Sequence, residues 1–412
     1  MQGKERRLVP ELRFGEFAED WRAFRLSELL KVTGEKSNGT EEVFSVSVDK
    51  GLVNQIEHLG RSYSAADTSH YKAVRPHEIV YTRSPTGDFP YGIIKQSQIS
   101  QRVIVSPLYG VYRPENNTIG HLIDQYFSLP NNAEKYLLPI IHKGAKNTIN
   151  INNKTFLSRR LALPCSLPEQ RKIASFITAV DGRLAGLRRQ RAALERYKRG
   201  VLQGVFSGES RFRDKNGENY SSWKTMKFGE AFKRVKRKNK ENNQNILTIS
   251  AQQGLVNQED YFNKSVSSKD VTGYYLIKRG EFAYNKSYSK GYPFGAIKRL
   301  NIYDKGVLSP LYICFAVSGS DILPEFMEQY FGGGGLNHEI SKIAQEGARN
   351  HGLLNVSVVE FFKDIKITVP SLPEQRRIAT FLRALDERLA LVERQLAGAE
   401  AFKRGLLQQM FV

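Results

Sequence analysis

The stretch SLPEQR at residues 166–171 decides the fold, because it recurs as SLPEQR at residues 371–376. The match continues without a gap to Phe206 and Phe411, and 24 of the 41 aligned positions are identical. Unrelated segments of that length would share about two or three residues, so the match indicates an internal duplication. The sequence therefore predicts one structural unit written twice in a single chain.

The duplication extends upstream as a framework of short motifs. GLVNQ at residues 51–55 recurs at 254–258, and SPLY at residues 106–109 recurs at 309–312. The other framework pairs are PYGIIK 90–95 with PFGAIK 293–298, GAKN 144–147 with GARN 347–350, and Arg13, Phe14, Trp21 and Glu28 with Arg211, Phe212, Trp223 and Glu230. Between these motifs the copies differ. A shared scaffold with different contents indicates one task performed on two different targets.

A long helix is predicted after each SLPEQR motif. Proline suits the first turn of a helix, and the glutamate beside it suits the positive end of the helix dipole. Apolar residues then recur at alternating spacings of three and four, which is typical of a coiled-coil seam. At about 39 residues and 1.5 Å per residue, each helix would be roughly 58 Å long. The seam residues predicted to pair the helices are Ile173, Phe176, Val180, Leu184, Leu187, Leu194, Val201, Ile378, Phe381, Leu385, Leu389, Val392, Leu396 and Leu406.

Each seam needs a partner, and the helix of the other copy is the first choice. If a pseudo-twofold axis relates the copies, the helices run antiparallel as a coiled coil. The alternative is that each helix packs on its own globular part. The predicted organisation is a first globular domain 1–165, a central helix 166–208, a second globular domain 209–370 and a C-terminal helix 371–412.

Both globular domains are predicted to be α+β. Loops rich in Gly, Pro and Ser separate short segments rich in Val, Ile, Phe and Tyr. Strands are predicted at residues 43–48, 78–81, 103–105, 246–249 and 281–284, and short helices at 124–127 and 324–331.

The charge of the chain favours a nucleic-acid partner. Lys and Arg number 62 against 42 acids, which gives a formal net charge of +20. Each phosphate that Lys or Arg neutralises releases a counterion, so double-stranded DNA is the expected partner. The alternative is a generally basic surface without a ligand.

Loops beside the predicted strands carry the residue types that bind DNA. Arg and Lys suit phosphates or the guanine edge, Asn suits the adenine edge, and glycine permits close approach of the backbone. A basic run between residues 215 and 240 either binds phosphates or is a solvated loop, and the first copy lacks it. For each side chain the alternative is simple exposure to solvent. The residues predicted to bind DNA are Arg83, Ser84, Lys143, Lys146, Asn147, Thr148, Lys236, Arg237, Lys238, Lys286, Ser287, Tyr288, Lys290, Arg349, Asn350 and His351.

No catalytic or metal-binding residue is predicted. Cys165 and Cys314 are too few for a four-cysteine zinc cluster or a disulfide framework. A Walker A loop, an Asn-Pro-Pro-aromatic methyltransferase motif and a nuclease set of acids with lysine are missing. The run 332–335 is interpreted as a flexible turn and not as a phosphate loop. With no apolar stretch of membrane length and no signal peptide, a cytoplasmic location and no membrane contact are expected.

Together these features resemble the specificity subunit of type I restriction-modification systems. The helix start LPEQR (167–171 and 372–376) carries the resemblance, and the sequences KRGVL (198–202) and KRGLL (403–407) near the helix ends support it. The resemblance implies two target recognition domains, each reading one half of a bipartite, asymmetric DNA site. It also implies that the paired helices set the spacer between the two halves.

The resemblance further implies partner subunits that perform the chemistry. Two methyltransferase (modification) subunits would dock on this chain and methylate adenines with S-adenosylmethionine. A separate restriction/translocase subunit, using ATP and Mg, would cut unmethylated DNA. This chain would hold no cofactor and would be a non-catalytic DNA-binding subunit in a bacterial or archaeal cytoplasm.

Other functions stay open from the residues alone. A stand-alone DNA-binding regulator would have its helix seams satisfied within the chain and would need no methyltransferase. An enzyme with an unfamiliar active site would act without partners. A coiled-coil scaffold that binds only protein would leave the charge of +20 unexplained.

Overall fold

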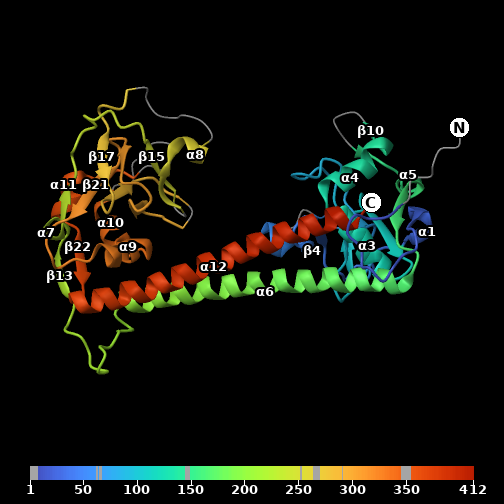
Figure 1. Cartoon of the computed structure of the whole chain (residues 1–412), viewed down its shortest axis with the longest axis horizontal. Coiled ribbons are helices and arrows are strands. Elements are labelled where there is room, and N and C mark those ends of the chain that lie inside the picture. Colours follow the sequence, from blue (N-terminus) through green and yellow to red (C-terminus); the bar gives the residue numbers. More distant parts are fainter. Residues whose placement is uncertain are drawn as a thin grey trace. The chain divides into compact units, whose positions relative to one another are not determined.

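The duplication of the sequence reappears as two units of the fold (Figure 1). The computed structural model describes residues 8–61, 64, 67–143, 149–250, 253–262, 270–289, 291–344 and 354–412. Unit 1 comprises Met1–Arg188 and Arg394–Val412, and unit 2 comprises Arg189–Glu393. Each unit therefore holds one globular part, the first half of the long helix that follows it and the far end of the other long helix.

The first globular part is built from short strands and helices. In chain order they are β1 (Arg22–Arg25), α1 (Leu26–Leu29), β2 (Leu30–Val32), β3 (Phe44–Ser47), β4 (Gly51–Asn54), α2 (Gln55–Leu59), β5 (Lys72–Val74), β6 (Ile79–Tyr81), β7 (Ile94–Gln96), β8 (Val103–Val105), β9 (Gly110–Pro114), α3 (Asn117–Phe127), α4 (Pro130–Leu137), the 3-10 helix η1 (Leu138–Ile140), β10 (His142–Lys143), β11 (Ile149–Asn150), α5 (Asn153–Ser158) and β12 (Arg160–Leu163), followed by the long helix α6 (Leu167–Phe206). The central antiparallel sheet has the order β2-β9-β6-β7, and the pairs β1-β12, β3-β4, β5-β8 and β10-β11 surround it.

The second globular part repeats this arrangement. Its elements are β13 (Lys224–Lys227), α7 (Phe228–Ala231), β14 (Phe232–Arg234), β15 (Leu247–Ser250), β16 (Gly254–Asn257), α8 (Gln258–Phe262), β17 (Tyr275–Lys278), β18 (Phe282–Asn285), β19 (Ala296–Arg299), β20 (Lys305–Leu308), β21 (Ile313–Val317), α9 (Pro324–Gly332), α10 (Asn337–Ile343), α11 (Val358–Lys363) and β22 (Lys366–Val369), followed by the long helix α12 (Leu372–Met410). The central sheet β14-β21-β18-β19 and the pairs β13-β22, β15-β16 and β17-β20 match the central sheet and the pairs β1-β12, β3-β4 and β5-β8 of unit 1, while β10-β11 has no counterpart among the described residues of unit 2.

The predicted α+β fold with two long helices is confirmed. The five predicted strand segments overlap β3, β6, β8, β15 and β18, and the two short helix segments fall in α3 and α9. The central strand β6 is buried on both faces, because Ile79, Val80 and Tyr81 are all buried, and this explains its continuous apolar run.

The glycine run 332–335 ends α9 and forms the turn that the sequence predicts, and neighbouring rings pack closely against it. The Gly335 N–H donates to the Tyr330 carbonyl at 2.9 Å. A Cβ on Gly335 would lie 2.5 Å from the Tyr330 ring, and one on Gly333 would lie 3.1 Å from the Phe206 ring. Glycine is needed here for close packing between α9, α10 and the end of α6.

The long helices α6 and α12 run antiparallel within each unit. In unit 1, Lys403 Nζ lies 2.5 Å from Asp181 Oδ1, and Arg188 Nη2 lies 2.7 Å from Glu400 Oε1. Residue numbers therefore rise along α6 while they fall along α12. An equivalent lysine–aspartate pair joins the helices in unit 2.

The first turns of each helix pack on the globular part that precedes them. Ile173 lies in the core of unit 1. The Phe176 ring meets the Phe14 ring at 5.7 Å, and the Phe381 ring meets the Phe212 ring at 5.5 Å. For these turns the alternative prediction, packing of each helix on its own globular part, describes the contacts better than helix pairing.

Farther along, the seam faces the other helix. Four predicted seam residues are buried there and belong to neither globular core, so the paired helix covers them. They are Leu184, Leu187, Val392 and Leu396. The predicted residues Val180, Leu194, Val201, Leu385 and Leu389 are half-buried, Ile378 lies in the core of unit 2, and Leu406 lies in the core of unit 1.

The last turns of each helix complete the core of the unit that they reach. In unit 1 the Phe411 ring meets Trp21 at 6.4 Å and Tyr126 at 5.8 Å. In unit 2 the Phe206 ring meets Tyr330 at 5.1 Å. Each globular core thus depends on the far end of the other repeat's helix.

A buried glutamate fixes the start of each long helix. In unit 2, Glu374 is fully buried and accepts from Arg211 Nη2 at 2.6 Å and from the Trp223 indole at 3.2 Å. In unit 1, Glu169 binds Arg13 and Trp21 in the same way. The recurring Glu of SLPEQR therefore anchors the segment that leads into each globular part.

We predict that Arg211→Ala lowers the free energy of unfolding by roughly 2–3 kcal/mol, because it leaves the Glu374 carboxylate buried and without its ion-pair partner. Urea unfolding followed by circular dichroism measures the loss. The matched control is Arg376→Ala, since Arg376 is exposed two residues further along the same helix. Equal stability of the two variants would contradict the anchoring role.

Candidate nucleic-acid interface

The loop that follows β6, which the sequence predicts to bind DNA, lies at one end of the central sheet. In unit 1, the loop after β6 lies beside the turn that leads into β9, because these strands are paired neighbours. The Arg83 guanidinium ties the parts together, donating to the Leu108 carbonyl at 3.1 Å and to Asn153 Oδ1 at 2.7 Å. Loop face 1 is defined as residues 83–92, 106–109 and 153.

The Arg83 guanidinium joins the parts of loop face 1. Two of its nitrogens are engaged within unit 1, and its backbone is left-handed at φ 58°. The contact of Arg83 with DNA stays a prediction. Ser84 follows it directly and is exposed.

Unit 2 carries the equivalent loop face 2, defined as residues 286–289, 291–295, 309–312 and 354. The Leu354 N–H donates to the Lys286 carbonyl at 2.9 Å, which joins the loop after β18 to the segment before α11. Ser287 N–H donates to Asn285 Oδ1 at 3.1 Å, and the Tyr288 side chain is 62% exposed. The structure thus brings Lys286, Ser287 and Tyr288 to one surface.

One glycine in each loop face permits a close backbone approach. Gly92 and Gly295 have φ values of 93° and 79°, where L side chains are strained. A Cβ on Gly92 would lie 2.8 Å from Arg83 N, and a Cβ on Gly295 would lie 2.2 Å from the Asn285 carbonyl oxygen. These glycines explain why PYG and PFG recur in the sequence.

Part of the basic run of unit 2 is engaged in the fold. Arg237 donates to both carboxylate oxygens of Glu281 at 2.8 Å. Lys238 Nζ donates to the Gly273 carbonyl at 2.6 Å and lies 4.4 Å from the centre of the Tyr275 ring. Of the three residues predicted here to bind DNA, Lys236 alone is exposed without such a contact among the described residues.

Several predicted DNA contacts lie outside the described residues. They are Lys146, Asn147, Thr148, Lys290, Arg349, Asn350 and His351. Of Lys143 only the backbone is described, as part of β10.

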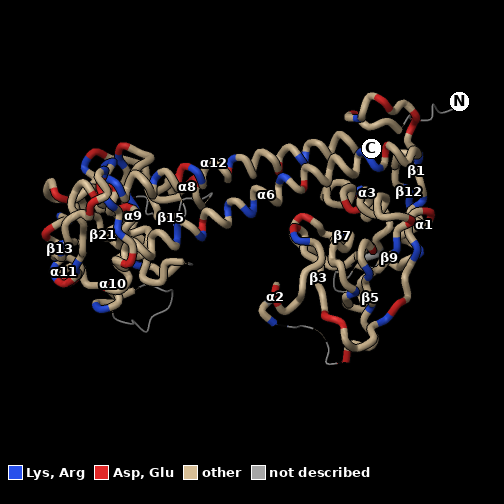
Figure 2. Tube along the Cα trace, turned by 90° about the horizontal axis from the view of Figure 1, so that it is seen from below, with Lys and Arg blue, Asp and Glu red and all other residues tan. Residues whose placement is uncertain are grey.

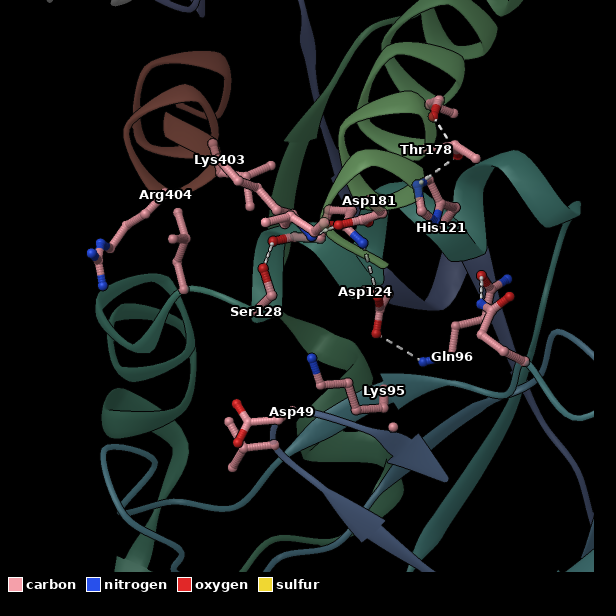
Figure 3. A pocket seen from close by; sticks show the side chains of 18 of the residues that line it. Asp49, Lys95, Gln96, His121, Asp124, Ser128, Thr178, Asp181, Lys403 and Arg404 are labelled. Atoms are coloured by element: carbon pink, nitrogen blue, oxygen red, sulfur yellow. Dashed lines mark hydrogen bonds and ion pairs between the residues drawn. The ribbon is translucent and has the colours of Figure 1, made fainter. Parts of the chain in front are cut away.

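A polar crevice that the sequence did not predict lies between the sheet edge, α3 and the long helices of unit 1 (Figure 3). Its cavity measures about 970 Å³. The Asp181–Lys403 ion pair crosses it, and His121 Nε2 lies 3.5 Å from Thr178 Oγ1. Burial lowers the pKa of His121, against the opposing effects of Asp124 and Asp181, so the imidazole is neutral at pH 7.

Unit 2 has the equivalent crevice, of about 990 Å³. Six polar positions that line the two crevices carry identical residues. The pairs are Lys95 with Lys298, Gln125 with Gln329, Asp181 with Asp386, Glu400 with Glu195, Lys403 with Lys198, and Arg404 with Arg199. A search for identical polar residues in the two copies, in place of apolar ones, would have found this site.

Charged residues are spread over the molecule without one dominant block. Figure 2 shows Lys and Arg recurring at intervals along α6 and α12 and over both globular parts. Within the described ranges, no group of three or more His, Cys, Asp or Glu side chains is arranged to hold a metal ion. Over those same ranges, no helix combines the length and apolarity that crossing a bilayer requires.

The family model and the curated protein that are similar to this chain carry the same family description. A family model described as "Type I restriction modification DNA specificity domain" matches residues 355–401, which include the second SLPEQR motif. Among curated proteins, the type I restriction enzyme MjaX specificity subunit of Methanocaldococcus jannaschii is 22% identical over 423 residues, covering 95% of this chain and 93% of that protein.

Solved structures also resemble the whole chain. The type I restriction-modification S subunit of M. genitalium has a TM-score of 0.57 and 13% identity, covering 98% of this chain and 99% of that one. The HsdS subunit of Thermoanaerobacter tengcongensis has a TM-score of 0.44 and 16% identity, covering 96% and 98%. The likeness to the M. genitalium subunit shows that the fold is shared over the full length.

We predict that Gly295→Ala destabilises unit 2 by about 2–4 kcal/mol, because the new methyl group collides with the Asn285 carbonyl in addition to straining the backbone. Thermal and urea unfolding measure the loss. Gly254→Ala is the matched control, since Gly254 also has positive φ (86°) but faces open space, and it should lose only about 1 kcal/mol. Similar losses in both variants would show that the close approach is unimportant.

Proposed function

We propose that the chain is a specificity subunit of a type I restriction-modification system and that it directs DNA methylation to a bipartite, asymmetric site, which the similarities to that family support. Each loop face reads one half of that site on double-stranded DNA. The observation that carries the proposal is the contrast between a repeated scaffold and loop faces whose residues differ.

The loop faces differ where base contacts would be made. Position 83 is Arg in unit 1 and its equivalent, Lys286, is Lys in unit 2; Pro85 corresponds to Tyr288. The strands that hold these loops pair identically in both units. Different side chains on one frame suit two readers that contact different base edges, because sequence is read through those edges and not through the phosphates.

The crevices differ from the loop faces because six of their polar positions carry the same residues in both units. A shared set of residues suits a partner that binds twice. We therefore assign the crevices to two copies of a methyltransferase subunit, one in each unit. The exposed Arg404 and Arg199 side chains supply the same positive charge at both crevices.

The long helices suit the role of a spacer. α6 has 40 residues and α12 has 39, and no proline interrupts either one after its first turn. Helices of matched length, paired antiparallel, hold a fixed number of base pairs between the half-sites. Binding through two readers also lets each one hold its half-site weakly.

The chemistry belongs to the partners in this proposal. S-adenosylmethionine would bind the methyltransferase subunits, and ATP and Mg a restriction/translocase subunit where one is present. The role of this chain is to select the adenines that are methylated.

Methylome sequencing of cells that express the chain with its methyltransferase should reveal one new bipartite adenine-methylation motif with a fixed spacer. Cells with the methyltransferase alone are the control. Unchanged methylation beside an active methyltransferase would refute the proposal and favour a stand-alone DNA-binding protein. Methylation by the isolated chain would instead identify it as an enzyme.

A second prediction concerns docking. Arg404→Glu should weaken binding of one methyltransferase copy about tenfold or more, because a negative charge replaces the positive charge that crevice 1 presents to its partner. Arg404→Glu with Arg199→Glu should release both copies, as counted by native mass spectrometry. The control is Arg196→Glu. Arg196 is exposed on the same helix as Arg199, but its counterpart is Ala401, so this arginine is not shared by the two copies. Two bound copies in the double variant would remove the crevices from the docking surface.

A further inference from the structure

Each loop face exposes one leucine at the same place. Leu108 is 74% exposed and Leu311 is 66% exposed, and both occupy the third position of an SPLY turn. Among the described residues they are two of the three most exposed large apolar side chains. A leucine this exposed contributes little to the stability of its own unit, so folding alone does not account for its presence in both copies.

The turns that carry these leucines are rigid. In unit 1, the Tyr109 N–H donates to the Ser106 carbonyl at 3.0 Å and the Leu108 N–H donates to Ser106 Oγ at 3.3 Å. The Leu108 carbonyl accepts from Arg83 at 3.1 Å, and the Tyr109 carbonyl accepts from Lys72 Nζ at 2.5 Å. The backbone is therefore held from several sides while the leucine side chain faces solvent.

Unit 2 builds the same turn. The Tyr312 N–H donates to the Ser309 carbonyl at 3.1 Å, and the Leu311 N–H donates to Ser309 Oγ at 3.4 Å. The tyrosine hydroxyl lies 3.3 Å from Thr248 Oγ1, so its ring points back into the unit. Leu311 is therefore the one large apolar side chain of this turn that faces outward.

We propose that Leu108 and Leu311 are direct base contacts, one for each half-site. This inference rests on the proposed DNA-reading function. The leucine side chain has no charge and no hydrogen-bond donor, so on a DNA-binding surface it cannot bind a phosphate. The apolar surfaces that DNA presents are the thymine methyl group in the major groove and the faces of unstacked bases.

Methylation of adenine accounts for the second of these apolar surfaces, the face of an unstacked base. An enzyme must turn the target adenine out of the stack to reach its amino group, which leaves the neighbouring bases without a stacking partner. A rigid apolar side chain can fill that space without losing conformational entropy of the backbone. Both sources share one chemistry, an apolar contact between leucine and a base.

The test uses the complex of the chain with its methyltransferase subunits. The DNA duplexes keep one half-site of the mapped motif and scramble the other. Leu108→Ala should bind about tenfold more weakly than wild type where only the first half-site is intact, and equally well where only the second is intact. Leu311→Ala should show the reverse. Fluorescence anisotropy at fixed salt gives both affinities.

The affinity of each variant for the duplex with the other half-site thus serves as its internal control. Leu391→Ala, an exposed leucine on α12, should change neither affinity. Because Leu108 and Leu311 are exposed, their truncation should leave the melting temperature unchanged, and this is checked on every variant.

Two further duplexes separate the two apolar sources. If the contact is a thymine methyl, replacing thymine by deoxyuridine weakens wild type but not Leu108→Ala. If the contact is an unstacked base, 2-aminopurine beside the target adenine brightens with wild type and much less with Leu108→Ala. Either result supports the base contact.

The base contact is wrong if Leu108→Ala binds both half-site duplexes like wild type, or loses the same affinity on both. Failure of the underlying function looks different. In that case the wild-type complex would not distinguish either half-site from fully scrambled DNA, before any variant is compared.

Discussion

A carboxylate buried at the start of each long helix governs how each unit is assembled. An ionised carboxylate removed from water costs several kcal/mol unless its oxygens are hydrogen-bonded to a cation. Glu169 and Glu374 meet this requirement with an arginine and a tryptophan from the segment that leads into the globular part. The strand after that tryptophan then pairs with the strand just before the helix, as in β1-β12 and β13-β22. The globular part therefore begins and ends at one point, and the helix leaves from that point.

A helix fixed at its start still needs a partner along the rest of its length, and antiparallel pairing supplies one. It also brings the last turn of each helix into the core of a unit that begins elsewhere in the chain. Phe411 fills space beside Trp21, and Phe206 fills space beside Tyr330. The two repeats are consequently not independent domains, since neither core is complete without the helix end from the other copy.

The sequence predicted the parts of the structure that follow from repetition and periodicity. SLPEQR and the apolar spacing after it gave the helices to within a residue or two, and short β-rich runs gave five strands. Individual roles in the loops could not be obtained in this way. Arg83 is the type of residue that binds DNA, yet its partners are a carbonyl and an amide that only the fold brings near. Nor did spacing along one helix reveal that Asp181 would meet Lys403, because that pairing depends on the register between two helices.

The same physics explains how the loop faces can differ while the two units are built in the same way. The residues that recur in both copies are those with little freedom: a buried ion pair, glycines at positive φ, lysine–aspartate pairs between helices. The loop faces extend from strand ends whose backbone hydrogen bonds are satisfied by neighbouring strands, so substitutions at their tips leave the sheet intact. Leu108 and Leu311 depart from this division, because their side chains are exposed on the loop faces and yet are the same in both copies. Under the proposed function, a residue kept where the fold does not require it fits a contact that both half-sites would share, and bases adjoining a flipped adenine would be present at both.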